Sequence, residues 1–332
     1  MATETTKKKQ TANKKASASR AKTPKTSKNG AAKSTSTDSK TTRQAITAAP
    51  AVSETSVSTA AATPSASTPS TSVGAGGKFK RWGLWLGVLY LLQGLAIVLF
   101  GNNASAPLTT QYFSVDTLAS DANGHQVVAS AMRHLHDVRL AWVIAVVLAL
   151  FAAVHFVMAY ATQAWHEDAL KRGVNPLRSA ALGFGGGAMV VTIALLGGIS
   201  DIATLVLLFA LSIVGALLGL AAETVVTRDN GAMSRFSHLL CGLSIVSVVL
   251  PWVVFAGQIV AAMLFNGHIP GYVYGVYGSM FVLFMAGVWA THQRIVRSGK
   301  WADAAYAETA FLILMLVGAS ALAWQTFAGA MR

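Results

Sequence analysis

The sequence divides into a polar stretch and a hydrophobic stretch that meet near Lys80. Residues 1–80 contain almost no large apolar side chains, whereas residues 81–330 contain nearly all of them. A helix needs about 20 mostly apolar residues to cross the hydrocarbon core of a bilayer. Seven stretches meet this requirement. They predict an all-α membrane protein, a seven-transmembrane helix bundle with spans at 82–101, 140–162, 179–198, 201–222, 238–265, 271–291 and 304–328.

The basic residues predict the side of the membrane that each loop faces, because Lys and Arg gather in cytoplasmic loops. Of the 26 Lys and Arg residues, 15 lie in positions 1–81, 8 in loops on the same predicted side, and 3 on the other side. We therefore expect a multi-pass protein of the cell membrane with its N-terminus inside and its C-terminus outside. The loop at 102–139 is then external. Its sequence predicts a short hairpin around Tyr112, Phe113 and Val115, followed by an amphipathic helix over Val127–Leu140.

Residues 1–80 form a tail of Lys, Ser, Thr and Ala that carries most of the formal net charge of +13. Such a composition cannot bury enough apolar surface to offset the entropy of ordering, so we expect a disordered cytoplasmic tail. Three roles stay open, in falling order of preference. The tail helps to fix topology and solubility, it contacts anionic lipid, or it binds nucleic acid non-specifically.

The predicted spans hold few ionisable side chains, which limits the functions that they can serve. His155 is the one titratable residue well inside a span, either as a hydrogen-bonded packing residue or as a proton acceptor. Glu223 and Glu308 are expected near the cytoplasmic ends of spans four and seven, within reach of water. A pump or proton-coupled transporter lines its path with several such groups, so this pattern argues against a transporter or channel. No nucleophile–base pair or phosphate-binding loop supports an enzyme.

Metal binding is not expected in the external loop. His134 and His136 are two residues apart and would not share a helix face, which argues against a joint site with Asp137. Cys241 is the single cysteine of the chain, so an intrachain disulfide and a cysteine-based metal site are both excluded.

Glycines at a four-residue spacing predict close helix packing in three spans. A G-x-x-x-G pattern is formed by Gly183 with Gly187, by Gly215 with Gly219, and by Gly271 with Gly275. The pattern lets two helix backbones approach each other closely. It allows a homodimer without requiring one.

Several runs in the last three spans resemble the heliorhodopsin family. They are Pro251-Trp252, the run Ile-Pro-Gly-Tyr-Val-Tyr-Gly at 269–275, Gly299-Lys300-Trp301, and Ser-Ala-Leu-Ala-Trp-Gln at 320–325. Their order and spacing are similar to those of the family, and so are Gln93 in span one and His155-Phe156 in span two. The resemblance covers 80–330. It implies a seven-helix fold with a cytoplasmic N-terminus and an external C-terminus, which agrees with the topology above.

The resemblance also implies that two residues of the family's retinal site are replaced. The family's Schiff-base lysine stands directly before the 320–325 run, where this chain has Ala319. The family's counterion glutamate aligns with Ala181, and a histidine of span one aligns with Tyr90. Without the lysine, a buried carboxylate would lack its positive partner, so the two losses belong together. The chain is expected to hold no covalent retinal.

These observations support two hypotheses on function. The first is a signalling or partner-regulating scaffold with a cytoplasmic protein partner. The second is a receptor that binds retinal, a carotenoid or a lipid non-covalently, in a cavity enlarged by Ala319 and the glycines at 185–187. The candidate pocket residues are Tyr90, Gln93, His155, Gly186, Trp252, Trp289, Ser320 and Trp324.

Overall fold

The computed structural model describes residues 75–161, 168 and 172–332, which belong to one compact unit. Among these residues, seven helical spans are long and apolar enough to cross a membrane, which confirms the predicted number. The predicted lipid and nucleic-acid contacts of the tail fall on residues outside the described part. The spans are Arg81–Phe100, Leu140–Tyr160, Pro176–Leu196, Ile202–Arg228, Arg235–Leu264, Gly271–Ile295 and Ala304–Ala330.

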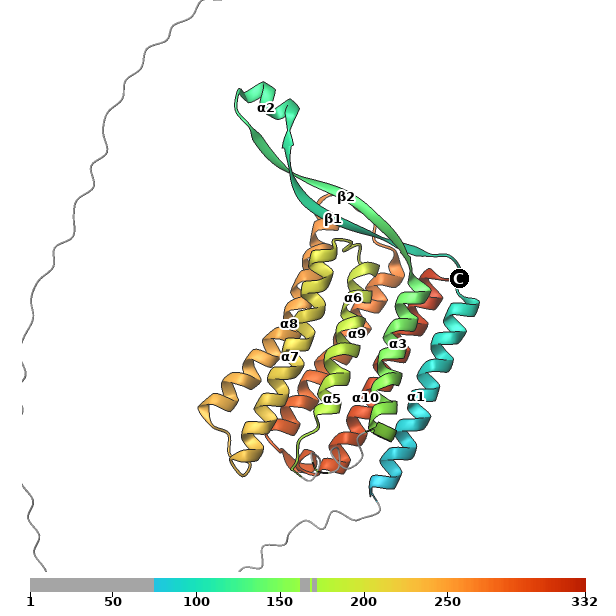
Figure 1. The fold of residues 1–332 in the computed structure, drawn as a ribbon, viewed down its shortest axis with the longest axis vertical. Coiled ribbons are helices and arrows are strands. Elements are labelled where there is room, and N and C mark those ends of the chain that lie inside the picture. The colour runs from blue at the N-terminus through green and yellow to red at the C-terminus, as the bar shows by residue number, and fades with distance from the viewer. Residues whose placement is uncertain (1–74, 162–167, 169–171) are drawn as a thin grey trace, which may run out of the picture. The chain divides into compact units, whose positions relative to one another are not determined.

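The spans stand side by side as a bundle, with a β-hairpin at one end (Figure 1). We call this end the hairpin end, and the other, where α1 begins, the opposite end. The first two spans are α1 (Ala75–Phe100) and α3 (Leu140–Phe156) with the π-helical turn η1 (Val157–Ala161). The third joins α5 (Pro176–Ala180), the π-helical turn η2 (Ala181–Gly185) and α6 (Gly186–Leu196). The others are α7 (Ile202–Arg228), α8 (Arg235–Leu264), α9 (Gly271–Ile295) and α10 (Ala304–Ala330), with the 3-10 turn η3 (Gly299–Ala302) before α10.

The third span begins three residues earlier than predicted, because Asn175 and Pro176 start the helix. The Asn175 side chain accepts a hydrogen bond from the Arg178 backbone N–H at 3.1 Å. This is the usual N-cap interaction, and proline is favoured at the first helical position because its fixed φ suits the helix. Arg178 therefore lies in the first turn of a membrane-spanning helix and not in a loop.

The loop between the first two spans is a β-hairpin with a short helix at its tip. Strand β1 (Ser105–Asp116) pairs antiparallel with β2 (Val127–Arg139), and α2 (Thr117–Asn123) connects them. The predicted hairpin is present but longer than expected, and the predicted helix over Val127–Leu140 is wrong. A lone surface helix has little to pack against. Pairing with β1 instead gives this segment inter-strand backbone hydrogen bonds along its length.

The hairpin is fastened to the bundle near its base. The Thr109 backbone N–H donates to the Ser200 carbonyl at 2.9 Å, in the turn between α6 and α7. The hydroxyls of the same two residues lie 3.0 Å apart. The C-terminus lies beside the end of α1 (Figure 1), where the Asn102 side chain donates to the Arg332 carbonyl at 3.1 Å.

The bundle is apolar both inside and outside. Tyr90, Leu148 and Ile193 are fully buried between helices. Large apolar side chains such as Leu92 and Val282 are exposed on the outer surface. A soluble protein rarely exposes a continuous apolar surface of this kind, whereas a bundle in lipid requires one.

Candidate functional site

Four charged side chains meet at the opposite end of the bundle, each from a different span. Arg178 of α5 donates to the carboxylates of Glu223 of α7 and Glu308 of α10. Arg294 of α9 donates from Nε to Glu223 at 3.2 Å. Asn175 donates to the second oxygen of Glu308 at 2.6 Å. We call these five residues the charge cluster.

Arg294 also ties the charge cluster to two connecting segments. Its guanidinium donates to the carbonyl of Gly173 at 3.0 Å and to the carbonyls of Trp301 and Ala302 at 3.1 and 3.2 Å. On the other side of the cluster, the Arg178 guanidinium lies 4.7 Å from the centre of the Phe311 ring, in cation–π geometry. The cluster thus joins the ends of four spans to the segments around Gly173 and η3.

The charge cluster is buried, which corrects the prediction that water reaches Glu223 and Glu308. Their exposed fractions are 4% and 6%, and both Arg178 and Arg294 are 5% exposed. The two arginines balance the two glutamates, and buried charges are tolerated when they are paired and hydrogen-bonded in this way. From the sequence, these four charged residues were not expected to lie together. The missed signal is that all four lie at span ends on the same predicted side of the membrane.

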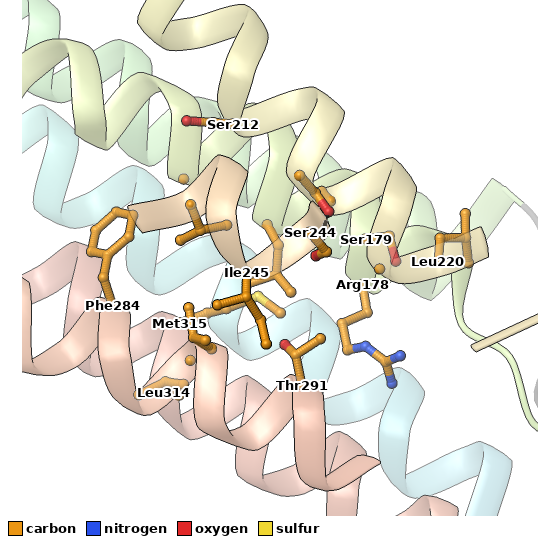
Figure 2. Close-up of a pocket in the computed structure, with 18 of the residues that line it drawn as sticks. Arg178, Ser179, Ser212, Leu220, Ser244, Ile245, Phe284, Thr291, Leu314 and Met315 are labelled. Carbon is orange, nitrogen blue, oxygen red and sulfur yellow. Dashed lines mark hydrogen bonds between the residues drawn. The ribbon is translucent and has the colours of Figure 1, made fainter. Parts of the chain in front are cut away.

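A cavity of about 130 Å³ lies beside the charge cluster, lined by residues of the second to the seventh spans (Figure 2). Arg178 and Glu223 form part of its wall. Most of the remaining wall is apolar, with Leu182, Met189 and Phe284 among its members. Its other polar or weakly polar lining residues are Ser179, Ser212, Cys241, Ser244, Thr291 and His292.

Of the three consecutive glycines in the third span, one faces the cavity. A Cβ atom on Gly186 would meet nothing within 4 Å, and Gly186 lines the cavity. A Cβ on Gly185 would lie 2.5 Å from the Phe151 ring, and one on Gly187 would lie 2.8 Å from the Phe209 ring. The expectation that all three glycines enlarge a cavity is therefore wrong, because two aromatic rings fill the space beside the outer two.

Other glycines of the third and fourth spans pack closely against neighbouring helices. A Cβ on Gly183 would lie 3.2 Å from Ala216 of α7, which is tight contact. On α7, a Cβ on Gly215 would lie 3.1 Å from Val248, and one on Gly219 would lie 3.2 Å from the Ser244 hydroxyl. Ser244 of α8 also donates to the Gly215 carbonyl at 2.7 Å. These two G-x-x-x-G pairs thus face helices of the same chain, whereas a Cβ on Gly271 or Gly275 of the third pair would meet nothing within 4 Å.

The remaining candidate pocket residues lie outside the wall of this cavity. His155 and Tyr90 are fully buried, with ring centroids 5.3 Å apart. His155 Nδ1 lies 2.7 Å from the Phe151 carbonyl. Because a carbonyl only accepts, Nδ1 carries the proton in this arrangement. Neither His155 Nε2 nor the Tyr90 hydroxyl has a hydrogen-bond partner among the described residues.

The aromatic candidates occupy three separate places. Trp252 is buried among aromatic rings, 5.5 Å from Phe284 between centroids. Trp324 donates to the Gln93 side chain at 3.1 Å on a more exposed surface. Trp289 is 56% exposed. Ser320 is partly buried, next to Ala319.

A family model described as Heliorhodopsin matches residues 79–331. The chain belongs to the heliorhodopsin family. The match takes in all seven spans and the hairpin, which confirms the resemblance read from the runs near the C-terminus. No curated protein matches the sequence significantly.

Two alanines stand where the heliorhodopsin resemblance puts the retinal lysine and its counterion. Ala319 of α10 and Ala181 at the start of the π-helical turn η2 are each 1% exposed. Neither lines the cavity, although the neighbouring Gly318 and Leu182 do. The cavity therefore reaches within one residue of each position.

The hairpin end of this heliorhodopsin-family chain holds two further polar features. His134 pairs with Asp137 at 2.9 Å on the exposed surface of β2. Within the described residues, no group of three or more His, Cys, Asp or Glu side chains is placed to hold a metal ion. Asp201 caps α7 by accepting from the Thr204 N–H at 2.9 Å and the Thr204 hydroxyl at 2.8 Å. These hydrogen bonds lower the pKa of Asp201, because they favour the charged carboxylate.

Proposed function

We propose that this heliorhodopsin-family protein works without covalently bound retinal and without pumping ions, as a membrane scaffold that signals to or regulates a partner protein. The observation that carries the proposal is Ala319, buried in α10 where the family's Schiff-base lysine is expected. The sequence has no lysine between Lys80 and Lys300 other than Lys171, and none after Lys300. A Schiff base to retinal needs an amine side chain, and no span offers one.

Ion pumping finds little support in the distribution of charge. The charged side chains buried at the opposite end are paired with each other in the charge cluster. His155 lies apart from them, and it is held by a backbone carbonyl. A proton path needs a series of titratable groups across the membrane. One histidine and one neutral cluster do not supply such a series.

A signalling role is supported by the way in which the charge cluster joins the spans. We propose that the opposite end faces the cytoplasm, as the excess of basic residues on that side predicts. Arg294 then connects the interior of the bundle to backbone at Gly173 and Trp301, on the side where a cytoplasmic partner would bind. A shift of one span would change the contacts of these segments. The scaffold would act in this way in the cell membrane, as a monomer or as a homodimer.

Trapping with borohydride tests the absence of a Schiff base. The purified full chain is incubated with all-trans-retinal and borohydride, which reduces a Schiff base to a stable amine, and peptides are then mapped by mass. We expect no retinyl group on any peptide from the spans. The Ala319→Lys variant, treated in parallel, shows whether retinal can reach this position. A retinyl group at full occupancy on the wild-type spans would contradict the proposal.

The cavity favours the second hypothesis in a modified form. An engineered apolar cavity of about 150 Å³ in another protein binds benzene. A cavity of about 130 Å³ therefore suits a molecule of that size, whereas a retinal or carotenoid would extend out of it. A non-covalent ligand at this place would be a small molecule.

A further inference from the structure

We propose that the cavity beside the charge cluster is a binding site for a small uncharged molecule, about the size of one six-membered ring, that carries one hydroxyl group. The inference rests on the proposed function in one respect only, namely that this ligand would be the chemical stimulus to which the scaffold responds. The site itself is argued from its walls. These walls decide three properties of the ligand, namely its size, its lack of charge and its one polar group.

The size follows from the volume and from the residues that create it. The cavity measures about 130 Å³, and close packing is the rule in protein interiors. The space is left open because Gly186 carries no side chain and no other group moves into its place. At the neighbouring glycines, by contrast, Phe151 and Phe209 close the gap. Gly186 is therefore one of the positions at which the wall leaves space for a ligand.

The lack of charge follows from the state of the charged residues in the wall. Arg178 is bonded to Glu223 and Glu308, and Glu223 is bonded in addition to Arg294. A ligand with its own charge would find each of these four groups already neutralised, and the other titratable side chain of the wall besides the Cys241 thiol, His292, is exposed at the outer surface. Such a ligand would lose its hydration without gaining a free counterion, which is costly in an apolar site.

The single hydroxyl follows from the one lining hydroxyl that remains free among the described residues. Most hydroxyls around the cavity bond to the backbone, as Ser212 does to the Leu208 carbonyl and Ser244 to the Gly215 carbonyl. Within the described part of the chain, no hydrogen-bond partner is found for the Thr291 hydroxyl. Figure 2 shows Thr291 between Met315 and Arg178, beside the apolar wall. A ligand hydroxyl can donate to this oxygen or accept from it, while the ligand ring contacts the apolar wall.

Cys241 provides a reporter for the site. It is the only cysteine of the chain, it is buried, and it lines the cavity. The experiment follows the rate at which the small uncharged reagent methyl methanethiosulfonate modifies Cys241, in the full chain in lipid nanodiscs and without retinal. Phenol is the probe. At a concentration about ten times its dissociation constant, we expect phenol to slow the modification about tenfold, by mass action.

Two variants and a second probe separate binding from partition into lipid. Gly186→Leu fills the cavity, so phenol should no longer change the rate. Gly278→Leu adds the same side chain on α9 at an exposed position where a Cβ meets nothing within 4 Å, and it should behave as the wild type. Benzenesulfonate, a charged ring of similar size, should not protect Cys241.

Protection that is absent, that never saturates with phenol, or that is equal in Gly186→Leu overturns the proposal. Where Cys241 of the wild type reacts too slowly to follow, the same contrast is read from the thermal unfolding midpoint. A saturable rise with phenol is then expected in the wild type and in Gly278→Leu, and its absence in the wild type overturns the proposal. A covalent retinal adduct would overturn the proposed function and leave this titration unaffected.

Discussion

The charge cluster gives the sharpest prediction on stability. Glu308→Gln keeps the shape of the side chain and removes its charge, so Arg178 and Arg294 then share Glu223 alone. The exposed fractions of these groups are all 6% or less, so little water can replace the lost partner. Removing one partner of a buried ion pair costs about 3–5 kcal/mol, mainly because the other charge stays buried and unpaired. We expect a loss of free energy of unfolding in that range.

A double-mutant cycle tests the reason for this loss. In Arg178→Gln/Glu308→Gln, one charge of each sign is gone, and the Arg294–Glu223 pair stays balanced. The double variant should lose less stability than the sum of the two single variants, by about 1–3 kcal/mol, which is the usual coupling between residues in contact. The assay is reversible unfolding in mixed micelles, followed by the fluorescence of the tryptophans. A loss below about 1 kcal/mol in Glu308→Gln, the range of a surface ion pair, or additive losses in the cycle would refute a buried and coupled cluster.

Two further predictions concern packing and pH. Gly185→Ala places a methyl group 2.5 Å from the Phe151 ring and should destabilise the bundle by about 1–3 kcal/mol, whereas the methyl group of Gly186→Ala meets nothing within 4 Å and should change stability little. Equal changes of the thermal unfolding midpoint in the two variants would contradict this account of the cavity. The hydrogen bonds from Thr204 lower the pKa of Asp201, so the charged carboxylate stabilises the start of α7 at pH values above the ordinary pKa of 3.8. This stabilisation is lost as the pH falls through the lower pKa of the folded state. Asp201→Asn should therefore reduce the acid dependence of unfolding, and an unchanged profile between pH 2 and 5 would count against the cap.

The sequence was sufficient to predict the membrane-spanning bundle, because each span needs a long apolar run and the runs are separated by polar turns. The family was also predictable from short runs such as residues 320–325. Local structure outside the membrane was harder to predict. Val127–Arg139 has apolar residues at spacings that suit a surface helix, but pairing with β1 decides its conformation, and that contact is distant in sequence.

The candidate site was predicted only in part, for a similar reason. A pattern along one span indicates which residues face inward, but not which residues of other spans they meet. Arg178 and Glu308 are 130 positions apart, and their pairing depends on the arrangement of four spans. The consecutive glycines 185–187 look equivalent in sequence. Their neighbours Phe151 and Phe209 make two of them packing positions and leave Gly186 at the cavity.

The most direct test of the central claim is the visible absorption spectrum of the full chain, expressed with all-trans-retinal and purified. An established retinal protein made in the same cells shows that retinal is available, and the Ala319→Lys/Ala181→Glu variant shows whether the bundle can accept the chromophore. We predict that the wild-type protein has no absorption band beyond that of free retinal. A red-shifted band that persists through purification would contradict the claim that this heliorhodopsin-family protein works without covalently bound retinal.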